Sequence, residues 1–186
     1  LPDDRKKRYI NEYNLSSYDA FVLTSDKSVS DFFDNVIKFD KSLKQSSKIG
    51  VNWITSELFS LLNENDLEIY NSPISPENLG KLVKLIKDDV ISGKIAKDVL
   101  LEMFESSKEP EKIIEEKGLK QVTDISKIEN IVDEVINENQ KMVHQYLSGK
   151  DKLLGFFVGQ AMKKSEGKAN PKILNDIFKE RLSKKN

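Results

Sequence analysis

The chain has 186 residues, 33% of them charged and 38% hydrophobic, with a formal net charge of −1. This length suffices for one or two domains with a buried core. The sequence has no cysteine and one histidine, His144, which excludes a disulfide framework, a cysteine zinc site and a cluster of histidine ligands. We therefore expect no metal site within these residues.

The longest apolar run, residues 153–158, is far shorter than a membrane span, and no signal-peptide pattern opens the chain. These features predict a soluble protein without a membrane partner, and the absence of cysteine favours the reducing cytoplasm. The chain opens on Leu1 and Pro2 rather than on an initiator methionine, which indicates a fragment of a longer protein.

The small net charge conceals a division of charge along the chain. Residues 141–186 contain eleven Lys or Arg and four Asp or Glu, a local balance of +7, which leaves −8 for residues 1–140. A basic end on an acidic body predicts an oriented contact with a polyanion. The alternative is a lysine-rich end that only keeps the chain soluble.

Apolar residues recur at helical spacing throughout the first 118 residues. The helices predicted there cover, in chain order, residues 5–10, 17–23 with Ser17 as the N-cap, 29–39, 46–63, 76–86 after the cap Ser75, 93–104 after the cap Ser92, and 110–117. The aromatic density of residues 18–39 predicts that these side chains are buried. Trp53 is likewise expected to pack in the core rather than to stack on a base.

Two features that suggest catalysis have simpler explanations. Gly93-Lys94 resembles the end of a phosphate-binding P-loop, but Asp88 occupies the position of the first glycine and Ile95 that of the Ser or Thr. The acid pairs Asp88-Asp89 and Glu115-Glu116 are adjacent in sequence, so on a helix their side chains diverge. No catalytic residue is predicted.

Residues 119–124 mark the boundary between two parts of the chain. Four helices are predicted after it, over residues 125–136, 139–149 with Asn139 as the cap, 150–164 and 171–182. No segment alternates with the period of a strand. The predicted fold is all-α, with a helical domain over 1–122 and a compact four-helix tail domain over 123–186.

The helix after residue 150 has an unusual face. Opposite its apolar arc, Lys152, Gly155, Gly159 and Lys163 line up in a narrow strip, with Phe156 and Gln160 beside it. Two glycines within a helix cost about 1 kcal/mol each relative to alanine. A floor without side chains therefore predicts that something large lies against it, either a second helix or a sugar-phosphate backbone held between the lysines.

The turn after this helix ends in Asn170-Pro171, an N-cap residue followed by proline at the first helical position. Lys168 stands just before it. Free amides at such a helix start bind anions, so this turn is a second candidate contact for phosphate. The alternative is an ordinary capped turn.

Several segments together resemble a known family. They are Asn52-Trp53, residues 91–97, residues 116–121, and above all residues 155–163 with 167–171, which read GFFVGQAMK and GKANP. These segments resemble the C-terminal part of GatB, the B-subunit family of the aspartyl/glutamyl-tRNA(Asn/Gln) amidotransferases, in the family's order and over nearly the whole chain. The last part also looks like the YqeY domain, and the archaeal GatE subunit carries a similar tail.

The resemblance implies a role in a ligase that converts misacylated Glu-tRNA(Gln) or Asp-tRNA(Asn) to Gln-tRNA(Gln) or Asn-tRNA(Asn). In the family, an N-terminal domain binds ATP and Mg²⁺ and activates the side-chain carboxylate, and ammonia derived from glutamine by the GatA subunit forms the amide. GatC is the third subunit. That N-terminal domain is absent from these residues, so this fragment alone is expected to be non-catalytic and to hold no cofactor.

In the family, the tail contacts the outer corner of the tRNA near the D-loop. The resemblance and the charge division together predict a set of RNA-binding residues, namely Lys150, Lys152, Gly155, Phe156, Gly159, Gln160, Lys163, Lys164 and Lys168. The lysines would neutralise phosphates, the glycines would let the backbone approach, and Phe156 or Gln160 would meet an unstacked base or a ribose hydroxyl. The alternatives are a helical protein-interaction module in the same complex and a YqeY- or GatE-type tail.

Overall fold

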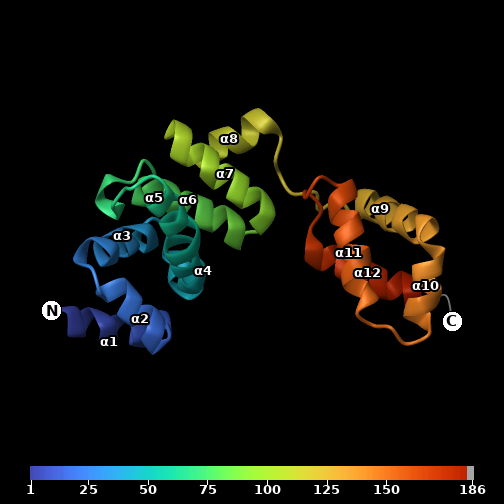
Figure 1. The fold of residues 1–186 in the computed structure, drawn as a ribbon, viewed down its shortest axis with the longest axis horizontal. Helices are drawn as coiled ribbons and strands as arrows, with labels where there is room; N and C mark the ends of the chain where they lie inside the picture. The colour runs from blue at the N-terminus through green and yellow to red at the C-terminus, as the bar shows by residue number, and fades with distance from the viewer. Residues whose placement is uncertain (184–186) are drawn as a thin grey trace. The chain divides into compact units, whose positions relative to one another are not determined.

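The computed structural model describes residues 1–183 and confirms the all-α fold, with no strand in this range (Figure 1). The α-helices are α1 (Pro2–Tyr13), α2 (Ser17–Thr24), α3 (Lys27–Lys38), α4 (Ser47–Asn52), α5 (Phe59–Glu64), α6 (Pro76–Lys87), α7 (Gly93–Ser106), α8 (Pro110–Lys117), α9 (Ile125–Glu138), α10 (Gln140–Leu147), α11 (Leu153–Lys164) and α12 (Pro171–Ser183). Short 3₁₀ turns cover Lys41–Ser46 and Ile69–Asn71, and a π-helical turn over Trp53–Leu58 joins α4 to α5.

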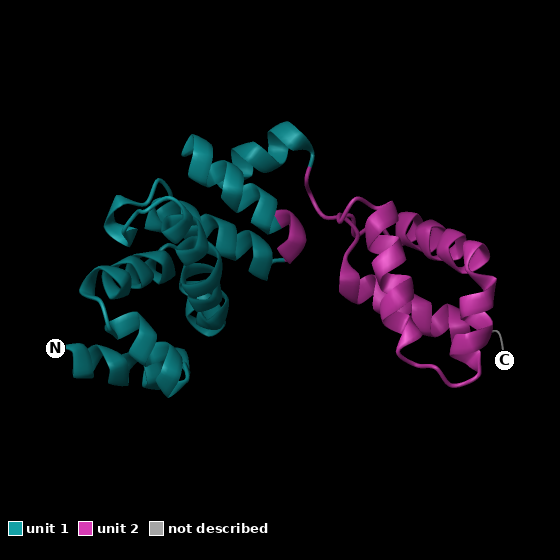
Figure 2. Ribbon diagram, in the orientation of Figure 1, with its two compact units in different colours: residues 1–88, 96–118 teal, residues 89–95, 119–186 magenta. Residues whose placement is uncertain are grey.

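The chain divides into two compact units (Figure 2). Unit 1 comprises residues 1–88 and 96–118, and unit 2 comprises residues 89–95 together with the chain from residue 119 onward. The predicted division into a helical domain over 1–122 and a tail domain over 123–186 stays a prediction.

Unit 1 is a helical bundle whose core includes Phe33, Ile54 and Leu79, all fully buried. Trp53 is 8% exposed and therefore packs in the core as predicted. At one edge, Arg8 donates from Nη2 to both carboxylate oxygens of Asp34 at 2.6 and 2.7 Å.

Two sequence predictions about α2 are wrong. Its N-cap is Ser16, whose Oγ accepts from the Asp19 amide at 3.0 Å, so the helix begins one residue away from the predicted cap Ser17. Tyr18 and Phe21 are 75% and 57% exposed rather than buried. The sequence showed apolar residues on every side of this helix, but unit 1 covers only the side of Ala20 and Leu23.

Unit 2 contains the four predicted tail helices, α9 to α12, around an aliphatic core with the two buried rings Phe157 and Phe178. The ring of Phe157 stacks on that of Phe178 with 5.7 Å between centroids, and Tyr146 meets Phe157 edge-on at 6.1 Å. The predicted cap Asn139 precedes α10, but its amide instead donates to the Val135 carbonyl at 2.8 Å, because the chain passes from α9 into α10 without an extended residue.

Residues 89–95 complete unit 2 by binding the loop between α11 and α12. Ser92 Oγ accepts from the Ile95 amide at 3.2 Å, which confirms it as the N-cap of α7, and donates to the Gly167 carbonyl at 3.0 Å. Val122 pairs with the same loop, since its amide donates to the Lys168 carbonyl at 2.6 Å. The loop that carries Lys168 is therefore held at several points.

Candidate nucleic-acid interface

The helix α11 lies with one face in the core of unit 2. Phe157 and Ala161 are fully buried on this face, and Leu154 and Val158 pack partly buried at its edges. Because these residues recur every three to four positions, they occupy one side of the helix. The strip of Lys152, Gly155, Gly159 and Lys163 is consequently turned away from the core.

The two glycines of the strip are uncovered. A Cβ atom built on Gly155 or on Gly159 would meet no neighbouring atom of the described chain within 4 Å, and both residues are exposed. No helix of unit 2 within the described residues therefore packs on this floor. The floor is left open for a partner from outside unit 2.

The lysines at the two ends of the strip are available. Lys152 and Lys163 are exposed, and neither makes an ion pair with a carboxylate of residues 1–183. Lys150 is also exposed and lines an open hollow with Lys152, although Asp151 contributes a negative charge to the same hollow. Unneutralised ammonium groups beside a bare helix surface form a suitable place for a phosphate backbone.

Lys164 lies on a different side of α11. Its Nζ is 3.0 Å from Glu138 and 3.5 Å from Glu134, both on α9. The hydrogen bond with Glu138 raises the pKa of Lys164 above its ordinary value, although burial opposes this. The charge of Lys164 is thus already balanced within unit 2, and the structure does not bring it to the strip.

Phe156 and Gln160 border the strip but are half-buried. Phe156 packs against the core of unit 2, and its ring centroid lies 5.6 Å from that of Phe157 in an edge-on arrangement. A base could reach only the exposed part of the Phe156 ring. Gln160 needs less exposed surface than Phe156, because a terminal amide can hydrogen-bond to a ribose hydroxyl without a stacking surface.

The turn that carries Lys168 is less exposed than the strip on α11. Lys168 is half-buried, and the preceding Gly167 adopts φ +77°, which a residue with a side chain would adopt only with strain. The N-cap prediction for Asn170 is confirmed, because its Oδ1 accepts from the amides of Lys172 and Ile173 at 2.9 and 3.1 Å. Two of the amides expected to bind an anion are therefore already satisfied, which favours the ordinary capped turn.

Sequence reasoning missed one cation near this turn. Lys94, at the start of α7, is exposed, and its Cδ would lie 3.5 Å from a Cβ built on Gly167. It is more than 70 positions away from Gly167 in the chain, so no spacing pattern could have grouped them. Lys94 adds a positive charge close to the Lys168 turn.

The acidic face of α9 explains which cations remain unpaired. Besides binding Lys164, it carries Glu129 and Asp133, which lie 3.5 and 3.4 Å from the guanidinium of Arg181 on α12. Two of the eleven cations counted in the basic end, Lys184 and Lys185, lie outside the described residues. Of the remaining seven, Lys150, Lys152 and Lys163 lie at or beside the strip, whereas Lys141, Lys172 and Lys179 are exposed elsewhere on unit 2 and Lys168 is half-buried.

Residues 1–183 contain no group of three or more His, Cys, Asp or Glu side chains that could hold a metal ion. None of their helices is long and apolar enough to cross a membrane. The expected ATP and Mg²⁺ of a preceding domain, and the cytoplasmic localisation, stay predictions.

Comparisons with known proteins agree on one family. A family model described as "GatB domain" matches residues 31–182. The B subunit of the aspartyl/glutamyl-tRNA(Asn/Gln) amidotransferase of Rickettsia rickettsii (strain Sheila Smith) is 51% identical over 183 residues, which cover 98% of this chain and 37% of that protein. The corresponding subunits of Pelagibacter ubique (strain HTCC1062) and Alkalilimnicola ehrlichii are 49% and 48% identical, with the same coverage.

The chain thus spans little more than a third of the length of these relatives, and it matches their C-terminal part. The strip, the Lys168 turn and the segment with Ser92 all lie within the part that the family model covers.

Proposed function

Because this chain belongs to the GatB domain family, we propose that it is the tRNA-binding and tRNA-positioning part of an amidotransferase B subunit. The parent subunit would act with GatA and GatC on Glu-tRNA(Gln), Asp-tRNA(Asn) or both, using ATP and ammonia derived from glutamine. The residues of this chain would take no part in the bond-making steps. Their task would be to hold the tRNA body so that its acylated end reaches the domain that performs the chemistry.

The observation that carries this proposal is the open glycine floor between unpaired lysines on α11. Gly155 and Gly159 leave the helix backbone exposed, and Lys152 and Lys163 stand at its ends without carboxylate partners in the described chain. Phosphates approach a surface closely only where side chains do not project, and each neutralised phosphate releases counterions. The floor would supply the close approach and the lysines would supply the affinity.

The rest of unit 2 would contribute to tRNA positioning only by packing against α11. The stacked Phe157 and Phe178 fix α11 on the tail core, and Glu138 on α9 neutralises Lys164, so the unpaired lysines of α11 lie on the side that faces away from the core. A charge fixed on a packed helix orients a polyanion. Gln160 at the edge of the floor could then distinguish RNA by its 2′-hydroxyl groups.

A salt series with paired charge reversals tests the proposal. The variant Lys152→Glu/Lys163→Glu should bind tRNA roughly ten-fold more weakly or worse, and its log-log salt slope should become shallower by about 1.5 to 2. The control Lys127→Glu/Lys141→Glu makes the same change in net charge at exposed lysines of α9 and α10 and should bind within about two-fold of the parent. Equal losses in the two variants would refute a role for the α11 face.

The same assay separates tRNA binding from the protein-interaction alternative. If the floor accepts a helix of another subunit, Gly159→Leu should abolish assembly with GatA and GatC while tRNA affinity survives. If it accepts tRNA, this variant should weaken tRNA binding, and tRNA with an altered D-loop should bind less tightly than intact tRNA. Fluorescence anisotropy with labelled tRNA and size-exclusion chromatography of the complex measure the two outcomes.

A further inference from the structure

The short helix α2 in unit 1 carries apolar side chains on both its inner and its outer face. Ala20 and Leu23 are buried on the inner face, while Tyr18 and Phe21 project from the outer face with 75% and 57% of their surfaces exposed. A helix that is hydrophobic all round is normally buried. The outer face of α2 therefore has the composition of an interior surface without being covered by the described chain.

This exposure is concentrated near the start of the chain. The large hydrophobic residues that are exposed within residues 1–183 number seven, and three of them, Leu1, Tyr18 and Phe21, fall in the first 21 positions. Single exposed apolar residues are common, but contiguous apolar patches mark interaction sites. Tyr18 and Phe21 are three positions apart and thus lie on the same side of α2.

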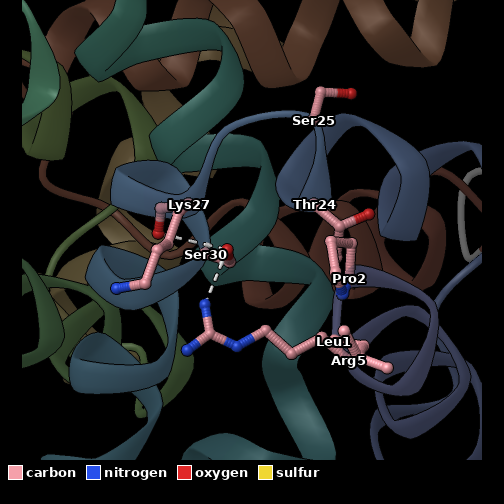
Figure 3. Close-up of a pocket in the computed structure, with 7 residues that line it drawn as sticks. All are labelled: Leu1, Pro2, Arg5, Thr24, Ser25, Lys27 and Ser30. Atoms are coloured by element: carbon pink, nitrogen blue, oxygen red, sulfur yellow. Dashed lines mark hydrogen bonds between the residues drawn. The ribbon is translucent and has the colours of Figure 1, made fainter.

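The chain enters unit 1 directly beside this helix. Leu1, which is 94% exposed, and Pro2 line a hollow of about 310 Å³ together with Thr24 and Ser25 from the end of α2, as Figure 3 shows. Any polypeptide attached ahead of Leu1 would therefore emerge next to α2. Phe21 and Tyr18 lie three and six positions before Thr24, which is about 5 and 9 Å along the helix axis, a span that a few extended residues can cover.

The family comparison places α1 and α2 at a junction. The match to the GatB domain begins at residue 31, after both helices, whereas the B subunits align over 98% of the chain. Those relatives extend beyond the match by nearly two thirds of their length, on the N-terminal side. The exposed helix thus belongs to the segment that links the GatB domain to whatever precedes it.

We propose that the outer face of α2 is the docking surface for the part of the longer protein that precedes Leu1. The surface fits an apolar segment that packs on Tyr18 and Phe21. Lys6 adds a polar border, since its Nζ lies 5.6 Å from the centre of the Phe21 ring and is free to pair with a carboxylate of the docked segment. This inference rests on the family and on α2 and does not depend on the function proposed for α11.

Side-chain labelling compares the 186-residue chain with the longer subunit. Hydroxyl-radical footprinting read by mass spectrometry should modify Tyr18 and Phe21 readily in the 186-residue chain and at least five-fold more slowly in the longer subunit. Tyr70, which is 72% exposed on the 3₁₀ turn Ile69–Asn71, provides an internal reference for the radical dose. Equal labelling of Tyr18 and Phe21 in the two proteins would overturn the proposal.

Two other occupants of the α2 outer face would give different labelling results, and either result would also overturn the proposal. A partner subunit would protect Tyr18 and Phe21 only after GatA and GatC are added to the isolated longer subunit. A second copy of this chain would make the protection depend on the concentration of the 186-residue chain, with a dimer in light scattering.

Substitution supplies an independent measurement. Tyr18→Gln/Phe21→Gln should lower the Tm of the longer subunit by about 3 °C or more, because it removes buried apolar contacts there, and should leave the Tm of the 186-residue chain within about 1 °C. Tyr70→Gln is the matched control and should alter neither protein. A Tm loss of the same size in both proteins would mean that Tyr18 and Phe21 stabilise unit 1 alone, and the docking surface would be rejected.

Discussion

Helices α2 and α11 each bury one face in a core, but their exposed faces differ in composition. Each buries an inner face, Ala20 with Leu23 on α2 and Phe157 with Ala161 on α11. On its outer side α2 carries two aromatic rings, whereas α11 carries two glycines. Apolar rings are stabilised by removal from water, while a bare backbone flanked by lysines is suited to a charged, hydrated partner.

This difference separates two kinds of contact by their response to salt. Binding through the α11 face should weaken steeply as salt rises, at a log-log slope between about −2 and −4 for three to five phosphate contacts. Packing on the α2 face should change little, because apolar burial does not involve counterions. Under the two proposals, the inner faces contribute stability and the outer faces contact partners.

The largest expected effect comes from emptying the inner side of α11. Phe157→Ala removes a fully buried ring that contacts Phe178 and Tyr146, and it should destabilise unit 2 by about 3 to 5 kcal/mol. Urea denaturation followed by circular dichroism measures the loss. Lys163→Ala on the outer side is the control and should change stability by less than about 0.5 kcal/mol. A small loss for Phe157→Ala would mean that the inner face is not what holds α11 in place.

The next effect concerns the loop that follows α11. Ser92→Ala removes both the cap of α7 and the hydrogen bond to Gly167, and it should cost about 1 to 2 kcal/mol in unfolding free energy. Ser75→Ala removes a comparable cap at the exposed start of α6, where water can replace the hydroxyl, and should cost about 0.5 to 1 kcal/mol. Thermal denaturation of the two variants gives the difference. Equal losses would show that the contact with Gly167 contributes nothing.

A smaller effect of opposite sign is expected on the outer side of α11. Gly159→Ala should stabilise the chain by up to about 1 kcal/mol, because alanine favours the helix and its methyl group would meet no atom within 4 Å. The same methyl group should weaken tRNA binding if phosphates approach the floor closely. Stability from urea denaturation and affinity from anisotropy should thus move in opposite directions. Improved stability with unchanged affinity would show that the glycine is not needed for the contact.

Local features of α11 followed from the sequence, and its long-range contacts did not. The period of α11 predicted that Gly155 and Gly159 lie opposite the apolar arc, and the structure leaves both uncovered. The same period could not show that Lys164 binds Glu138, because the two residues are 26 positions apart on different helices. The contact of Ser92 with Gly167 spans 75 positions and was missed for the same reason.

For α2 the sequence led to a wrong prediction of burial. Its apolar residues predicted burial, which holds in a complete core but fails where one side of a helix has no neighbour. Hydrophobicity reports which groups avoid water, and it does not report which molecule covers them. The all-α fold was predictable from periodicity, whereas the RNA-binding role of the α11 residues stays a prediction.

The smallest expected effect is a pH dependence of folding stability at the inner face of α2, which the inner face of α11 should lack. Burial alone would raise the pKa of Asp19, but hydrogen bonds from Lys48 and with Ser16 lower it below the ordinary value, whereas the inner face of α11 carries no carboxylate. A carboxylate with a depressed pKa stabilises the fold above about pH 4 and loses that contribution as the pH falls through its folded pKa. Because Lys48 is largely exposed, the contribution should stay below about 1 kcal/mol.

The variant Asp19→Asn tests this contribution. It should unfold at a lower temperature than the parent at pH 7, and the difference should shrink as the pH falls through the folded pKa of Asp19, where the carboxylate of the parent takes up a proton. Asp151→Asn, at an exposed carboxylate in the loop before α11, is the control and should show no such dependence. A Tm difference for Asp19→Asn that stays constant over the same fall in pH would assign its effect to packing and hydrogen bonding, and the ion pair with Lys48 would then play no part in holding α2 on unit 1.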